Sequence, residues 1–334
     1  MSQLGPVAAS SVVTPSMEGM TARARPLTGT PSPAPEPSYA MAALILGCLF
    51  VGSSSALIKL SGATAGTAAF LRCALALVVF APLLAVEWRR FGLPPRRMLV
   101  LSAGGGVFLG ADYLMWTQSI VDIGAGIATV LIGVQVVVFP FLAWLFQKEP
   151  VPTRFLVVLP LMFVGLALTG GVVDADAAAA NPVRGALLGV AAGVCYAAFL
   201  FLNRPASALD RRMLFTPVGT TTCVAALGIG AVAGLGDVAG GIDLALSAWA
   251  WVLLAMVAVL GQAVSFVLIG YGLVRLPAGR AAAVMLLQPL GAVALGMVAL
   301  HERPTPAQWA GIVITVVAVA LATVTRRRPR RRGR

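Results

Sequence analysis

Long apolar runs separated by short polar connections dominate the sequence. Beyond about residue 38, stretches of roughly twenty mostly apolar residues recur, each long enough to cross a hydrocarbon core of about 30 Å at a rise of about 1.5 Å per helical residue. Turn-forming residues and tryptophans mark many of the boundaries, as expected at a membrane interface. The pattern predicts an all-α membrane protein with about ten transmembrane helices, at residues 40–60, 64–86, 98–120, 124–146, 152–173, 184–203, 213–235, 248–272, 279–300 and 307–325.

The two ends of the chain depart from this pattern. Residues 1–38 are rich in proline, serine, threonine and alanine, a composition that cannot bury enough apolar surface to order itself, so we predict a disordered tail. A cleaved signal peptide is the alternative, but the first apolar run approaches a full span and lacks a small-residue cleavage site. Residues 326–334 form a short, strongly basic tail.

Composition excludes a water-soluble domain. Of the 334 residues 59% are hydrophobic and only 11% are charged, which leaves too little polar surface to cover a soluble globule of this length. The cysteines stand singly inside apolar runs, without the paired spacing of a disulfide or metal framework. We therefore predict no metal site, no cofactor and no disulfide.

The basic residues gather in every second connection. If the N-terminus is inside, the loops after the second, fourth, sixth and eighth spans and the C-terminal tail are rich in arginine and lysine, as cytoplasmic segments are. We predict a multi-pass protein of the cell (inner or plasma) membrane with both termini cytoplasmic. A net charge of +12 could also indicate nucleic-acid binding, but a basic tail that faces anionic lipid is the simpler reading. The expected partners are the lipid bilayer and a small-molecule substrate.

The membrane portion repeats itself. A shift of 145 positions sets the first span against the sixth, with Lys59 opposite Arg204. Because each unit then has five spans, the second unit enters the membrane from the opposite side, which gives inverted repeats. A shift of 153 positions aligns further pairs: Ala125 with Ala278, Gln135 with Gln288, and Glu149 with Glu302.

These units resemble the EamA repeat of the drug/metabolite transporter (DMT) superfamily. The shared features are an Ala/Gly-rich start, a long apolar helix and a glutamate at its end, seen here from Ala125 to Glu149 and from Ala278 to Glu302. Arg72 also resembles the family's arginine near the start of the second helix. The resemblance places one repeat at residues 39–174 and another at 183–325, and implies a ten-helix carrier of small metabolites or drugs with a central cavity between the halves.

Two ionisable residues lie deep inside predicted spans. Arg72 and Asp112 are each about nine residues from the outer end of their spans, roughly 13 Å deep, where an unpaired charge costs at least about 2.5–3.5 kcal/mol. Equal depth permits an ion pair. In one hypothesis Asp112 binds a substrate amine or a coupling proton. Arg72 then either keeps Asp112 ready for this binding or itself binds a substrate carboxylate. In the other, the two form a fixed structural pair.

Further polar and aromatic residues at similar depth complete the candidate substrate site. Amides can both donate to and accept from a small polar ligand, although they also join helices to one another, and aromatic rings either line a site or simply pack. The candidate substrate-binding residues are Arg72, Asp112, Tyr113, Trp116, Gln135, Tyr196, Gln262 and Gln288.

Other polar and small residues in the spans read as structural devices. Ser53, Ser54 and Ser55 are expected to form hydrogen bonds back to their own helix. The Gly-x-x-x-Gly motifs at 106–110 and 189–193 are expected to permit close helix approach. Glu149 and Glu302 are expected to cap the helix that follows each of them, with a role in a gate as the alternative.

Secondary transport is the function that the sequence favours. No phosphate-binding loop surrounds either lysine, so coupling to ATP within this chain is unsupported. An intramembrane aspartyl protease is an alternative, because residues 234–237 fit Gly-x-Gly-Asp and Asp112 could supply a second carboxylate, but the duplication then has no explanation. A passive channel is a further alternative, without the expected rings of like charge. We predict a non-enzymatic carrier, with export of amino-acid-like compounds as the favoured activity.

Overall fold

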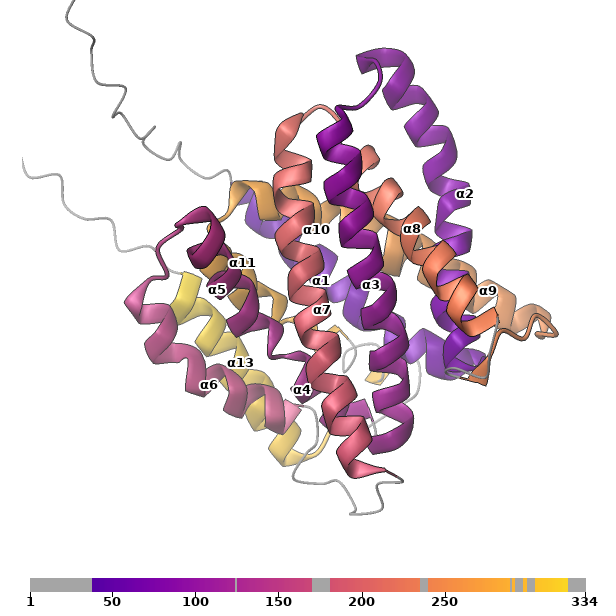
Figure 1. Cartoon of the computed structure of the whole chain (residues 1–334). Coiled ribbons are helices and arrows are strands. Elements are labelled where there is room, and N and C mark those ends of the chain that lie inside the picture. Colours follow the sequence, from indigo (N-terminus) through magenta and orange to yellow (C-terminus); the bar gives the residue numbers. More distant parts are fainter. Residues whose placement is uncertain are drawn as a thin grey trace, which may run out of the picture. The chain divides into compact units, whose positions relative to one another are not determined.

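The structure is a computed structural model, and it describes residues 38–123, 125–169, 181–234, 240–288, 290–291, 297–298 and 304–323. All regular elements in these ranges are helices (Figure 1). In chain order they are α1 (Ser38–Ser61), α2 (Ala65–Phe91), α3 (Arg96–Ile123), α4 (Ala125–Ile132), α5 (Gln135–Gln147), α6 (Thr153–Thr169), α7 (Pro182–Leu209), α8 (Phe215–Gly234), α9 (Ala248–Met256), η2 (Val257–Val264), α10 (Ser265–Arg275), α11 (Ala278–Met285) and α13 (Pro306–Thr323).

The predicted membrane spans correspond to these helices. In the described part of the chain, seven helices are long and apolar enough to cross a membrane, and Thr153–Thr169 and Pro306–Ala322 are shorter apolar helices. Many large apolar side chains are exposed, including Phe141, Trp144 and Val78, as expected for a surface that faces lipid. The all-α membrane fold is confirmed. The two predicted tails lie outside the described residues, except for Ser38, which begins α1. Most of residues 292–303, Glu302 among them, also lie outside.

The fourth and ninth predicted spans are not continuous helices. The fourth is divided into α4 and α5 by a turn at residues 133–134, and the ninth breaks after α11 at residues 286–287. Gly133 is a weak helix former, and Pro289 has no N–H group to donate to the carbonyl of Met285. Both breaks therefore have a cause in the local sequence.

The two breaks match residue for residue under the 153-position shift. Gly133 donates its backbone N–H to the carbonyl three residues earlier, at 3.1 Å, and Leu286 does the same at 3.2 Å. The next residues, Val134 and Leu287, repeat this three-residue bond at 3.2 and 2.9 Å. Each helical path thus tightens into a 3₁₀-type turn at the same place in its repeat.

A π-helix interrupts the eighth span. Residues 248–275 form α9, then η2, then α10, so one membrane crossing changes its hydrogen-bond register twice. π-helical segments are uncommon and occur often at functional sites. This one contains Gly261 and Gln262, and it packs against α1 and α2.

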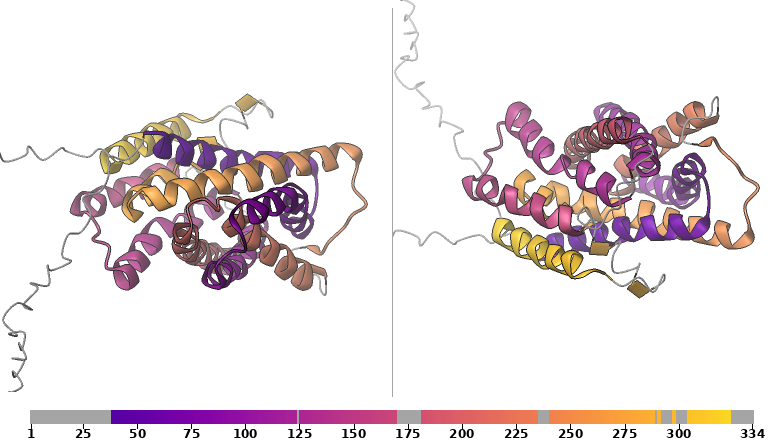
Figure 2. Two further views of the ribbon diagram at one scale, coloured as in Figure 1. Left: turned by 90° about the horizontal axis from the view of Figure 1, so that it is seen from above. Right: turned by 90° about the horizontal axis from the view of Figure 1, so that it is seen from below.

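Close contacts between the two predicted repeats hold the bundle together. Helix α7 runs beside α3 and also packs against α4 and α5, while α6 lies beside α13 and α1 beside α10 (Figures 1 and 2). Small residues permit close approaches between α3 and α8 and between α7 and α4, as predicted. A Cβ atom at Gly106 would come within 2.6 Å of the Thr221 carbonyl oxygen, and one at Gly193 within 2.7 Å of the Ile132 carbonyl oxygen, just before the break in the fourth span.

Polar side chains secure two helix ends. The Glu87 carboxylate accepts hydrogen bonds from the backbone N–H groups of Phe215 at 3.1 Å and Thr216 at 2.8 Å, which caps α8. Beyond the apolar part of α3, Arg184 donates from Nε to Asp122 at 2.8 Å, and the guanidinium holds the pKa of the Asp122 carboxyl below its usual range.

Candidate functional site

A cavity lies between helices of both predicted repeats, beside the two breaks. The volume within which the centre of a water-sized molecule fits is about 90 Å³. A cavity that holds one water molecule needs roughly 10–15 Å³ on the same measure. Most of its surface is apolar, with a few polar groups, as in small-molecule sites. The lining residues are Val51, Gly52, Ser54, Arg72, Asp112, Tyr113, Trp116, Ile132, Gly133, Gln135, Leu166, Tyr196, Phe266, Met285, Leu286 and Gln288.

Among the described residues of this lining, Arg72 and Asp112 are the charged ones, and both are buried. The ion pair that their depth permits is not formed. Arg72 instead donates from NH2 to the carbonyl of Gly261 at 3.0 Å, and its guanidinium lies over the Tyr113 ring, 4.3 Å from the centroid. Its Nε and the Oδ1 of Asp112 have no hydrogen-bond partner. Each of these two side chains therefore has one polar atom that can still form a hydrogen bond.

The π-helix positions this part of the site. Its Gly261 carbonyl accepts the bond from Arg72, and the next residue, Gln262, accepts a hydrogen bond from the Tyr113 hydroxyl at 2.7 Å. Gln262 in turn donates to the hydroxyl of Thr222 at 3.2 Å. Gln262 is fully buried and does not line the cavity, so its place in the structure is behind Tyr113. The other seven predicted site residues do line the cavity.

The repeat-related amides lie directly after the two helix breaks. Gln135 is the first residue of α5, and its Oε1 is buried without a partner. Gln288 donates to the Tyr196 hydroxyl at 3.2 Å. Trp116, from α3, adds a buried indole N–H that also lacks a partner. The symmetry seen in the sequence therefore brings both amides to one cavity.

Four residues of the lining each carry a buried polar atom without a hydrogen-bond partner, two of them donors and two acceptors. Arg72 Nε and Trp116 Nε1 are donors, whereas Asp112 Oδ1 and Gln135 Oε1 accept. A buried polar atom without a partner costs free energy, and most native proteins avoid one, so a group of four in one cavity points to a ligand that supplies the missing bonds. A molecule with both an anionic and a cationic end would satisfy the set.

Sequence reasoning missed several residues of this site. Ser54 and Gly52 of α1 line the cavity, and so do Ile132, Met285 and Leu286, which flank the breaks. Gly133 inside an apolar span and Pro289 inside another were signals for the breaks, because corresponding interruptions in two repeats mark transporter sites. The π-helix has no comparable signal in its sequence.

Comparisons with known proteins identify the family. The profile of the EamA-like transporter family matches residues 38–171 and again 183–324. No curated protein matches the chain. Among solved structures, one titled "Crystal structure of protein" superposes with a TM-score of 0.70 at 15% sequence identity, covering 86% of this chain and 96% of that one. The structural likeness supports the fold, and the two family matches cover most of the sequence, so the chain belongs to the EamA-like transporter family of the DMT superfamily.

Proposed function

We propose that this protein is a secondary transporter that exports small amino-acid-like or drug-like metabolites by alternating access around the central cavity. Its membership of a transporter family supports the general activity. The observation that carries the finer proposal is the set of four unpartnered donors and acceptors in the cavity. We place the protein in the cell membrane with both termini in the cytoplasm, from the distribution of its basic loops.

The cavity suits a zwitterion. The Arg72 guanidinium can bind a carboxylate, with the Trp116 indole N–H as a second donor. Asp112 and Gln135 can accept from an ammonium group on the same ligand. One cationic and one anionic side chain do not suit a ligand with two phosphate charges, because the second charge would remain uncompensated in a buried site.

The paired helix breaks support alternating access. Many transporters bind substrate where discontinuous helices of two inverted repeats meet. Here both breaks border the cavity, and each repeat contributes an amide directly after its break. The repeats could therefore open the same site to either face in turn.

The two alternative functions draw less support. A passive channel would carry rings of like charge, whereas the part of this lining that the structure describes has one arginine and one aspartate as its charged residues. An aspartyl protease needs two carboxylates side by side, and the described residues of the lining include one, Asp112. The second candidate carboxylate, Asp237, lies outside the described residues.

Counterflow in proteoliposomes tests the proposal. Purified protein is reconstituted with unlabelled compound inside, and entry of labelled amino acids, nucleobases, sugars and cationic dyes is followed from outside. We expect saturable exchange of one amino-acid class, competed by other zwitterions and not by compounds with only one of the two charges. Exchange of nucleobases, sugars or dyes alone would overturn the zwitterion assignment. Flux that does not saturate would favour a channel.

A further inference from the structure

An ion pair away from the cavity joins three helices. Arg204, near the end of α7, forms a salt bridge with Glu149, two residues beyond α5. The second oxygen of that carboxylate accepts the backbone N–H of Ala278, the first residue of α11, at 2.7 Å. Arg204 also donates to the carbonyls of Leu273 at 2.9 Å and Leu276 at 3.0 Å. We call the contacts among Glu149, Arg204 and Ala278 the latch.

The latch corrects the role expected for Glu149. The sequence predicts that this carboxylate caps the helix that follows it, α6, but it caps α11 instead, a helix of the other predicted repeat. The capping chemistry is as expected, since a carboxylate is stabilising at a helix N-terminus. The partner could not be identified from sequence spacing, because Ala278 is 129 positions away.

Two of the latched helices reach the cavity at their other ends. Helix α5 begins at Gln135, in the cavity wall, and ends at Gln147, close to the latch. Helix α11 begins at the latch and ends at Met285, also in the cavity wall. The 3₁₀-type turns lie at these cavity ends, and α5 and α11 pack against each other. Each of the two short helices therefore has the polar contacts of the latch at one end and a helix break at the other.

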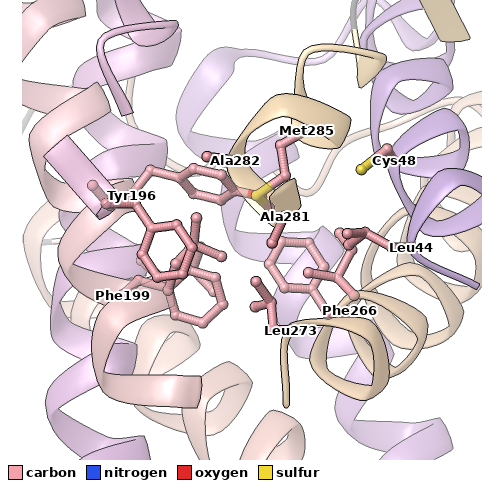
Figure 3. Packing of buried hydrophobic residues seen from close by; sticks show 14 of the residues in the cluster. Leu44, Cys48, Tyr196, Phe199, Phe266, Leu273, Ala281, Ala282 and Met285 are labelled. Atoms are coloured by element: carbon pink, nitrogen blue, oxygen red, sulfur yellow. The ribbon is translucent and has the colours of Figure 1, made fainter. Parts of the chain in front are cut away.

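Apolar side chains fill the space between the cavity and the latch. Figure 3 shows Leu44, Phe199, Phe266 and Leu273 packed around Ala281 of α11, and each of them is at most 2% exposed. These residues come from α1, α7, α10 and α11. Phe266 is part of the cavity lining and the Leu273 carbonyl accepts a hydrogen bond from Arg204, so this packed cluster extends from the cavity to the latch, and α11 supplies one side of it.

We propose that the latch is a gate tie, which keeps α11 packed over the cavity and which must break for the cavity to open toward that face. Movement would occur about the break at residues 286–287, where the helical hydrogen-bond pattern is already interrupted. Both charged side chains are partly solvent-exposed, at 16% and 23%, and ion pairs at such positions are weak enough to open and close. The inference depends on the proposed function only in requiring that the cavity opens.

Alkylation of a cavity cysteine tests the gate tie. In a chain with the four native cysteines replaced by alanine, Ser54→Cys places a thiol in the cavity wall. Adding Glu149→Gln removes the charge of the tie and weakens the cap on α11. We expect a water-soluble maleimide to react with Cys at position 54 about three- to tenfold faster, in line with the usual contributions of a cap and a partly exposed ion pair. An unchanged rate in a folded variant would overturn the proposal.

Glu87→Gln is the matched control. Glu87 also caps a helix of the second repeat, α8, through two backbone N–H groups, but neither it nor α8 lines the cavity. We expect its labelling rate to match that of the parent, and an equal rise in both variants would mean general loosening and contradict the gate tie. Arg204→Gln leaves Glu149 free to cap α11, so its labelling rate should rise less than that of Glu149→Gln. This variant replaces Glu149→Gln in the test if Glu149→Gln does not fold. Labelling needs no substrate, so failed counterflow with faster labelling would reject the proposed function alone.

Discussion

Asp112→Asn is expected to slow substrate counterflow by roughly ten- to a hundredfold. The substitution keeps the size of the side chain and removes the one carboxyl group among the described residues of the cavity lining. A hydrogen bond to a charged group contributes about 1.5–3 kcal/mol, and every 1.4 kcal/mol is about a tenfold change in affinity. Initial rates of counterflow at subsaturating substrate, with equal amounts of inserted protein, provide the measurement.

Asp122→Asn is the matched control for this variant. Asp122 is on the same helix, α3, but it pairs with Arg184 at the helix end and does not line the cavity. We expect its counterflow to remain close to that of the parent. Equal counterflow in Asp112→Asn and the parent would exclude Asp112 as a substrate ligand. If that variant kept counterflow and lost only proton-driven uptake, Asp112 would carry the coupling proton instead.

Arg72→Gln is expected to have the second-largest effect, and a different selectivity. The variant loses the cation that the described part of the lining supplies, so a substrate carboxylate would enter the buried site without that counter-charge. We expect zwitterion counterflow to fall by about tenfold or more, while amines that lack the carboxylate compete better than they do in the parent. Competition by matched amine and amino-acid pairs measures this shift.

Arg72→Lys separates charge from geometry. One guanidinium nitrogen of Arg72 donates to the Gly261 carbonyl, and the guanidinium group lies over the Tyr113 ring. Lysine keeps the charge but cannot stack as a plane or bind a carboxylate with two nitrogens. We expect partial recovery relative to Arg72→Gln. If both variants exchange the zwitterion as the parent does, Arg72 has only a structural role.

Much of the fold could be predicted from the sequence, because membrane spans are set by length and hydropathy alone. The predicted spans 64–86 and 213–235, for example, correspond to α2 and α8. The repeat offset is equally informative, because it pairs Gln135 with Gln288 and both of these amides line one cavity. Charged residues inside spans indicate Arg72 and Asp112 for a related reason, since burial of a charge is costly and therefore informative.

The remaining features depend on contacts between distant parts of the chain. Arg72 donates to a backbone carbonyl of the π-helix rather than pairing with Asp112, and sequence spacing indicates neither the π-helix nor this contact. Gln262 has the depth and chemistry of a ligand, yet Tyr113 and Thr222 occupy its hydrogen-bonding groups. Glu149 finds its helix N-terminus in the other repeat. Depth along a span can be counted from a sequence, whereas rotation about the helix axis and tertiary partners cannot.

Substrate protection of the cavity cysteine tests the central claim most directly. With Ser54→Cys in the cysteine-free chain, maleimide labelling is followed over a range of concentrations of the compound that gives saturable counterflow. If that compound binds in the cavity, it should slow labelling, with half-protection at the concentration that half-saturates exchange, and Asp112→Asn should abolish the protection. Undiminished labelling at concentrations that saturate exchange would show that the substrate binds elsewhere, and would contradict the account.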